Sequence, residues 1–222
     1  MSKLKIYGPA WSRANRVLWL ANELGLDYEQ PPIDFMAGEH KQAAFLAINP
    51  NGRVPAIEDG TLKLSESLAI NLYLAKHHGG GALYPQSPAE EAGIWQWTVW
   101  AASDIEMPLI TALVNRSIRP PEGRDLAAAD AAETRLQRGF GVLETVLTPR
   151  PYLLGEDFTL ADLAVASVLI YAPLCAITFD AYPHLAAWLE RCYARPAYRA
   201  LAASVAADPD APSWSRLPAC AA

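Results

Sequence analysis

The chain has 222 residues, is 52% hydrophobic and carries a formal net charge of −6. That size and apolar content supply the core of one large domain or two small ones, and the acidic balance argues against a nucleic-acid partner. No stretch approaches the roughly 20 uninterrupted apolar residues that a membrane helix needs, which argues against a membrane-spanning protein.

The chain begins with a pattern that predicts a strand and a turn. Residues 1–16 lack the longer apolar core and the cleavage site of a signal peptide, so we expect a cytoplasmic protein. Short apolar runs then alternate with helical patterns. They predict strands at 3–7, 28–34, 56–58 and 62–65, and helices at 13–24, 41–46 and 66–77. Short connections around the first helix favour parallel strands, and Asp59-Gly60 is a hairpin signal.

Beyond residue 78 the pattern is almost wholly helical. Helices are expected at 89–118, 124–147, 160–172, 184–192 and 196–206. We therefore predict an α/β domain over 1–79, a linker over 80–88, and an all-α domain with an irregular tail over 89–222. Thr159 and Asp162 have the spacing of a capping box at the start of a buried helix.

Cysteine and histidine spacing gives no sign of a metal or dithiol centre. Cys175, Cys192 and Cys220 lie far apart without a C-x-x-C motif, and the four histidines form no H-x-x-x-H pattern. We expect each cysteine to be a small buried or tail residue, and we expect no metal.

Two turns could hold parts of a peptide ligand. In residues 53–55, Arg-Val-Pro, a cis proline would turn the Val54 backbone outward to pair with an extended peptide, whereas an ordinary turn proline is the alternative. In residues 65–67, Ser-Glu-Ser, a strand passes into a helix whose N-terminus suits a carboxylate. Ser67 could donate to that carboxylate while Glu66 accepts from an ammonium group. The alternative is a plain N-cap followed by a first-turn acid.

Two more candidate sites lie at expected helix starts. His40 and Lys41 offer cations to a second carboxylate, unless they form a solvated helix start. Ser12, in the turn after the first strand, is either a helix cap or a hydrogen-bond donor to a bound thiolate.

Together these pieces resemble the glutathione transferase family, in its phi-like or related bacterial branches. N-P-N-G-R-V-P at 49–55 followed by E-S-L-A-I-N-L-Y-L at 66–74 is highly specific in combination. Leu83-Tyr84-Pro85, residues 155–162 and Arg195-Pro196-Ala197 extend the resemblance over roughly residues 3–206. The resemblance implies a thioredoxin-like first domain, an all-α second domain, a homodimer, and glutathione as co-substrate.

The resemblance also implies which positions bind glutathione. The Val54 backbone, beside a cis Pro55, would pair with the cysteinyl part. Glu66 and Ser67 would bind the γ-glutamyl head. The glycyl carboxylate would be held by His40, Lys41 and Arg53.

The residue that activates the thiol departs from the family pattern. In phi-like members a serine usually lies six residues before the valine of an Arg-Val pair, here Arg16-Val17, and that position is Trp11. Ser12 lies five residues before Val17. Because some bacterial members read S-R-x-x-R-V, as this chain does, Ser12 is the predicted activator. Tyr7 and a backbone N–H are the alternatives.

An electrophile pocket is expected between the domains. Its predicted walls are Trp11, Phe35 and Met36 on one side, and Trp100, Asp104, Ile105, Pro108 and Leu109 on the other. Such a lining suits small apolar electrophiles, although tryptophans on this helix also fit core or dimer packing.

The resemblance thus predicts a detoxifying transferase that activates the glutathione thiol as a thiolate for attack on apolar electrophiles or hydroperoxides. One alternative is a glutathione-dependent isomerase or dehalogenase. Another is a non-catalytic glutathione- or ligand-binding protein. A structural module is a third, but it would leave the combined glutathione motifs unexplained.

Overall fold

A four-stranded sheet with the order β2-β1-β3-β4 forms the base of the first domain. The structure is a computed structural model that describes residues 3–212, 215 and 217–218. Its strands are β1 (Leu4–Tyr7), β2 (Tyr28–Glu29), β3 (Ala56–Asp59) and β4 (Leu62–Ser65). β1 pairs with β2 in parallel, whereas the β1–β3 and β3–β4 pairs are antiparallel. The predicted β-α-β unit and the hairpin are therefore confirmed.

The second strand is shorter than predicted. It covers Tyr28–Glu29, whereas the apolar pattern suggested a strand over residues 28–34. Pro31 and Pro32 follow after one residue, Gln30, and neither proline has a backbone N–H to donate to a sheet. The chain therefore leaves the sheet early and enters a loop.

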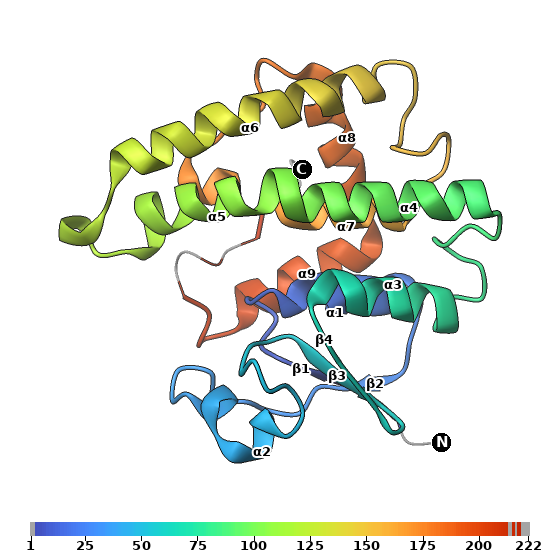
Figure 1. The fold of residues 1–222 in the computed structure, drawn as a ribbon, viewed down its shortest axis with the longest axis vertical. Coiled ribbons are helices and arrows are strands. Elements are labelled where there is room, and N and C mark those ends of the chain that lie inside the picture. The colour runs from blue at the N-terminus through green and yellow to red at the C-terminus, as the bar shows by residue number, and fades with distance from the viewer. Residues whose placement is uncertain (1–2, 213–214, 216, 219–222) are drawn as a thin grey trace.

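Helices cover both faces of this sheet. Figure 1 shows α1 (Ala14–Glu23) and α3 (Ser67–His78) between the sheet and the helical part of the molecule. A 3₁₀ turn (Glu39–Lys41) and α2 (Ala43–Leu46) lie away from that part, and Phe45 of α2 packs on Tyr7.

The second domain is helical, as predicted. Residues 88–118 form one rod in Figure 1, made of α4 (Pro88–Trp100), a π-helical segment (Ala101–Glu106), α5 (Met107–Leu113) and a second π-helical segment (Val114–Ile118). The other elements are 3₁₀ turns at Pro121–Gly123 and Pro173–Cys175 and the helices α6 (Leu126–Leu147), α7 (Leu160–Leu169), α8 (Pro183–Tyr193) and α9 (Pro196–Ala207). None of the helices in the described part of the chain is both long and apolar enough to cross a membrane.

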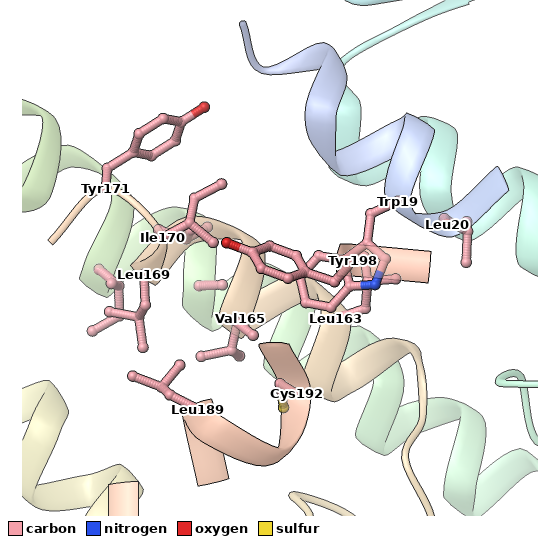
Figure 2. Packing of buried hydrophobic residues seen from close by; sticks show 14 of the residues in the cluster. Trp19, Leu20, Leu163, Val165, Leu169, Ile170, Tyr171, Leu189, Cys192 and Tyr198 are labelled. Carbon is pink, nitrogen blue, oxygen red and sulfur yellow. The ribbon is translucent and has the colours of Figure 1, made fainter. Parts of the chain in front are cut away.

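The two domains share one core, which centres on α1. Every residue of α1 from 14 to 21 is buried. The Trp19 ring lies 4.8 Å from the Tyr198 ring of α9, centroid to centroid, and Figure 2 shows the two rings beside Leu163 of α7. Arg195 donates to both carboxylate oxygens of Glu23 at 2.7 Å. The first domain is therefore covered by helices from the end of the chain.

The predicted capping box at the start of α7 is confirmed, and it has a wider role. Asp162 is fully buried and accepts from the Thr159 N–H at 2.9 Å. It also accepts from the Leu153 N–H at 2.8 Å and from Trp188 Nε1 of α8 at 2.9 Å. One carboxylate thus holds a loop and two helices together.

Two cysteines occupy buried positions, as expected. Burial raises the pKa of the Cys175 thiol to about 11 and that of Cys192 well above its ordinary value, so both stay protonated at neutral pH. Cys220 and the tail residues 213, 214, 216, 219, 221 and 222 lie outside the described residues. Within the described part, no group of three or more His, Cys, Asp or Glu side chains is placed to hold a metal ion.

Candidate functional site

The turn after β1 packs directly on the loop before β3. Gly8 has a φ of +125°, and a Cβ at this position would lie 2.9 Å from the Cβ of Val54. Glycine is therefore needed both for the backbone conformation and for the close approach. This contact places the Ser12 turn and Val54 beside the same pocket.

The Ser12 side chain is bonded within the turn before α1 and also faces the pocket. Its Oγ donates to the Pro9 carbonyl at 2.7 Å and accepts from the Ala14 N–H at 3.1 Å. The side chain is half-buried and lines the pocket together with Val54. Because a hydroxyl hydrogen rotates about a single bond, Ser12 could redirect its hydrogen from Pro9 to an acceptor in the pocket.

The Tyr7 hydroxyl is hydrogen-bonded within the sheet and not directed into the pocket. Its hydroxyl donates to Glu58 of β3, and Phe45 packs edge-on against its ring. Burial, reinforced by the Glu58 carboxylate, raises the pKa of Tyr7 to about 12. Tyr7 lines neither of the two pockets described below.

The loop before β3 presents Val54 next to a cis bond to Pro55. Buried Asn49 holds this loop: its Nδ2 donates to the Arg53 carbonyl at 2.7 Å, and its Oδ1 accepts from the Asn51 N–H at 3.1 Å. The cis geometry considered from the sequence is thus present, and Asn49 is a supporting residue that sequence reasoning did not single out.

The junction between β4 and α3 has an unusual backbone. Glu66 has a φ of +71° and an exposed side chain, and such conformations of non-glycine residues often occur at functional sites. Ser67 follows as the buried first residue of α3, and its Oγ accepts from Arg16 Nη1 at 3.3 Å. No acceptor in the described part of the chain takes the Ser67 hydrogen, which leaves it available for a bound carboxylate.

An ion pair lies beside Ser67 and lines the same pocket. Arg16 is 1% exposed, and its Nη1 lies 3.2 Å from Glu106 Oε1 in the second domain. Arg13 Nε lies 2.8 Å from the same oxygen. Sequence reasoning missed Glu106, because only the fold brings the end of a π-helical segment to the start of α1.

His40 and Lys41 flank the other end of the site. Lys41 Nζ donates to the Gly52 carbonyl at 2.5 Å, and the His40 ring stacks on Phe35 with 4.2 Å between centroids. Burial, together with the charge of Lys41, lowers the pKa of His40. Lys41 is therefore the stronger candidate of the two for holding a carboxylate at neutral pH.

Two pockets meet at Val54 and Arg53. One, of about 370 Å³, is lined by Ser12, His40, Lys41, Arg53 and Val54 among others. The second, of about 330 Å³, is lined by Arg53, Val54, Pro55, Glu66 and Ser67 together with Arg16 and Glu106. The structure thus brings all the predicted glutathione-binding residues and Ser12 to two adjoining pockets.

The predicted electrophile residues divide into two groups. Trp11 and Phe35 line the 370 Å³ pocket, with ring centroids 5.4 Å apart. Met36 is 75% exposed and borders a neighbouring pocket of about 640 Å³. The structure does not bring the others to either pocket: Trp100 and Asp104 face α6, and Ile105, Pro108 and Leu109 are buried in the core.

A π-helical segment, Ala101–Glu106, lies within this stretch, and its wider turns rotate the residues downstream of it relative to a regular α-helix. The apolar wall of the 370 Å³ pocket consists instead of Ile110, Leu113 and Ile118, with Tyr171 after α7.

Known proteins resemble both halves of the chain. The family model "Glutathione S-transferase, N-terminal domain" matches residues 2–76, and "Glutathione S-transferase, C-terminal domain" matches residues 106–196. A glutathione S-transferase of Hyoscyamus muticus is 36% identical, over 88% of this chain and 95% of its own. Glutathione S-transferase 3 of Zea mays is 36% identical, over 94% of this chain and 97% of its own.

Solved structures of glutathione S-transferases also resemble this chain. The theta class glutathione S-transferase of Xanthomonas axonopodis pv. citri with glutathione bound is 35% identical, with a TM-score of 0.82 over 90% of this chain and 97% of that chain. A glutathione S-transferase-I bound with lactoylglutathione is 34% identical, with a TM-score of 0.80 over 91% of this chain and 99% of that chain.

Proposed function

Since this chain belongs to the glutathione transferase family and is a glutathione transferase, we propose that Ser12 activates the glutathione thiol as a thiolate for attack on apolar electrophiles or hydroperoxides. The observation that carries this proposal is the position of the Ser12 hydroxyl, at the start of α1 and in one pocket with Val54. The physiological role would be the detoxification of such electrophiles.

The proposed glutathione pose runs across both pockets. The γ-glutamyl head lies at Glu66 and Ser67, where one side chain accepts from the ammonium group and the other donates to the carboxylate. The cysteinyl part pairs with the Val54 backbone as an added strand would. Lys41, with Arg53 and His40 nearby, holds the glycyl carboxylate. The matching structures that contain glutathione or lactoylglutathione support a ligand of this class.

The free energy needed to ionise the bound thiol is comparable to the strength of one hydrogen bond to a charged acceptor. A free thiol has a pKa near 8.5, and lowering it by about two units requires roughly 2.7 kcal/mol of preferential thiolate stabilisation. A hydrogen bond to a charged acceptor supplies about 1.5–3 kcal/mol, and the positive end of α1 adds to it. The bound thiolate then attacks an electrophile that the pocket holds in position.

Tyr7 is the weaker candidate for this role. Its hydrogen is already donated to Glu58, and its hydroxyl lies outside both pockets. A Tyr7→Phe variant therefore provides a control that removes a neighbouring hydroxyl without touching the proposed donor.

The test is the pH titration of thiolate absorbance from bound glutathione in wild type, Ser12→Ala and Tyr7→Phe. We expect wild type and Tyr7→Phe to ionise the thiol well below pH 8, and Ser12→Ala to shift the midpoint up by one to two units. An unchanged midpoint in Ser12→Ala would assign activation to the backbone. Bound glutathione with no shift in wild type would favour a non-catalytic binding protein.

We also propose a homodimer formed along the rod of residues 88–118. Val99, Met107 and Trp95 are 65%, 61% and 53% exposed there, and large exposed apolar side chains mark interaction surfaces. Sedimentation should give a dimer for wild type and a monomer for Val99→Glu with Met107→Glu. A matched Val142→Glu change on α6 should leave the dimer intact.

A cytoplasmic location completes the proposal, because glutathione is the thiol that keeps this compartment reducing. Cell fractionation with a tagged full-length chain would check it, and recovery in a secreted or membrane fraction would contradict it.

A further inference from the structure

A pocket of about 250 Å³ lies between α6 and α8, on the side of the molecule opposite the sheet (Figure 1). None of its lining residues belongs to either of the two pockets proposed for glutathione. The pocket is therefore a separate place where a small molecule can bind. Its lining combines three apolar residues, Leu147, Pro151 and Ala187, with three basic residues, Arg150, His184 and Arg191.

The charge of this pocket is opposite to that of the surrounding part of the chain. Residues 81–222 carry ten basic and sixteen acidic side chains. Among the described residues, no acidic side chain lines the pocket, whereas three basic ones do. Positive charge gathered in a concave site attracts anions. The ligand that fits this pocket is therefore an anion.

Hydrogen bonds to the backbone fix both arginines at the pocket. Arg150 Nε donates to the Val146 carbonyl at 3.1 Å, and Arg191 Nη2 donates to the Pro151 carbonyl at 2.9 Å. The Arg191 guanidinium also lies 5.9 Å from the centroid of the Tyr152 ring. Because Pro151 directly follows Arg150 in the chain, the second bond holds the Arg191 guanidinium beside the neighbour of Arg150.

Both guanidinium groups have donors left for a ligand. The bonds to the backbone use Nε of Arg150 and Nη2 of Arg191, and in the described part of the chain neither group has a carboxylate partner. Two like charges that line one pocket repel each other, and a bound anion relieves this repulsion. A guanidinium can donate two parallel hydrogen bonds to one oxyanion, which favours a phosphate or a carboxylate group.

His184 adds less charge to the pocket than the arginines do. Its Nδ1 lies 2.6 Å from Glu144 Oε1, and the other oxygen of this carboxylate accepts from the Leu185 N–H at 2.9 Å. Glu144 therefore offsets the positive charge of His184 when the ring is protonated. The charge left for a ligand is that of two arginines. It matches a phosphate monoester, with a charge of about −1.5 to −2 at neutral pH, better than a carboxylate with a single charge.

We propose that this pocket binds a small organic phosphate monoester. The phosphate lies between Arg150 and Arg191, and the organic group packs on Leu147, Pro151 and Ala187. Ala187 and Arg191 are four residues apart on one face of α8, so a single ligand can contact both. Because the pocket shares no residue with the two glutathione pockets, this ligand is neither glutathione nor the electrophile, and the inference does not depend on the proposed reaction.

The test is titration calorimetry of the full-length protein with phenyl phosphate, with and without saturating glutathione. We expect one binding site per chain and the same Kd under both conditions. Arg150→Gln and Arg191→Gln should each raise this Kd about tenfold or more. The matched control is Arg138→Gln, an exposed arginine on α6 that lines a different pocket. It removes the same charge and should change Kd by less than about twofold.

A second ligand tests the phosphate assignment. Benzoate carries the same ring on a carboxylate, and we expect it to bind about tenfold more weakly because it has one charge. Melting temperatures without ligand should agree among wild type and the three variants, which shows that a lower affinity does not come from unfolding.

Four outcomes would overturn the inference. Wild type would fail to bind phenyl phosphate, or benzoate would bind equally well. An equal loss in Arg138→Gln would show that only the overall charge attracts the anion. Loss of binding under saturating glutathione would place phenyl phosphate in the glutathione pockets.

Discussion

Arg16 of the first domain and Glu106 of the second form an ion pair, with Nη1 and Oε1 3.2 Å apart, and Arg16 also contacts Ser67. Arg16 is 1% exposed, and Glu106, which also pairs with Arg13, is the carboxylate in contact with its guanidinium. Because the same guanidinium donates to Ser67 Oγ, the pair connects domain packing to the proposed site of the γ-glutamyl head.

Glu106→Gln removes the charge that balances Arg16. Leaving a buried charge without its partner costs about 3–5 kcal/mol, so we expect the free energy of unfolding to fall by that amount. With Ser67 less firmly oriented, Kd for glutathione should rise about tenfold, which corresponds to about 1.4 kcal/mol. Urea unfolding and titration calorimetry measure the two effects.

Glu122→Gln, an exposed acid at the Pro121–Gly123 turn, should change neither quantity. A stable Glu106→Gln protein with normal affinity would contradict the role given to the pair.

Gly139→Ala tests the close contact between α6 and the π-helical segment. A Cβ at residue 139 would lie 2.4 Å from Ile105 Cδ1, so α6 must shift or Ile105 must change rotamer. Such overpacking costs about 1–3 kcal/mol. Gly141→Ala is the control on the same helix, because nothing lies within 4 Å of its added Cβ. That change should stabilise the helix by about 0.5–1 kcal/mol. Thermal unfolding should therefore move in opposite directions for the two variants, and shifts of equal sign would argue against the contact.

Asp162→Asn tests the carboxylate that joins α7, α8 and the loop at Leu153. An amide cannot accept at both ends, so at least one buried donor among its partners loses its acceptor, at a cost of about 1–3 kcal/mol. Chemical unfolding of this variant should show that loss. Asp157→Asn, a neighbouring exposed acid, should stay within about 0.5 kcal/mol of wild type. An Asp162→Asn protein as stable as this control would refute the bracing role.

Asp59 should make stability depend on pH in the acid range. Burial acts to raise its pKa, but the Tyr73 hydroxyl and the His78 ring outweigh it, and the net shift of the Asp59 pKa is downward. A depressed folded pKa contributes stability above the unfolded value, near 3.9, and the contribution is lost as the pH falls through the folded pKa. Asp59→Asn should thus be less stable than wild type at pH 6, and the difference should shrink as the pH falls through the lowered pKa of Asp59. Parallel curves over that range would rule out this contribution.

The fold could be predicted to a large extent from local signals. The Asp59-Gly60 turn, the Thr159–Asp162 spacing and the helical period of the second half each specify a short piece of backbone directly. The end of β2 could not be placed from apolar content, because it depends on the missing N–H groups of Pro31 and Pro32. The proposed domain boundary at residues 80–88 stays a prediction.

The predicted glutathione residues line the two pockets, whereas most of the predicted electrophile residues do not, and this difference has a physical reason. The proposed glutathione-site residues Val54 and Ser67 lie in the loop before β3 and at the first position of α3, where each position has a distinct backbone role that the sequence reveals. The apolar wall depends on the rotation of one long helix, and a π-helical segment changes that rotation without a clear sequence mark. Tyr171 and Glu106 enter the site through tertiary packing alone.

The packing of α9 and α7 on α1 has a consequence for recombining enzymes of this family. A chimera joined at the helix-free stretch after His78 would set α1 of one parent against α7 and α9 of the other, and Trp19 would meet foreign partners in place of Phe158 and Tyr198. A junction after His78 therefore avoids cutting a helix but separates α1 from the helices that pack on it. Chimeras should therefore take α1, Phe158 with α7, and α9 from the same parent.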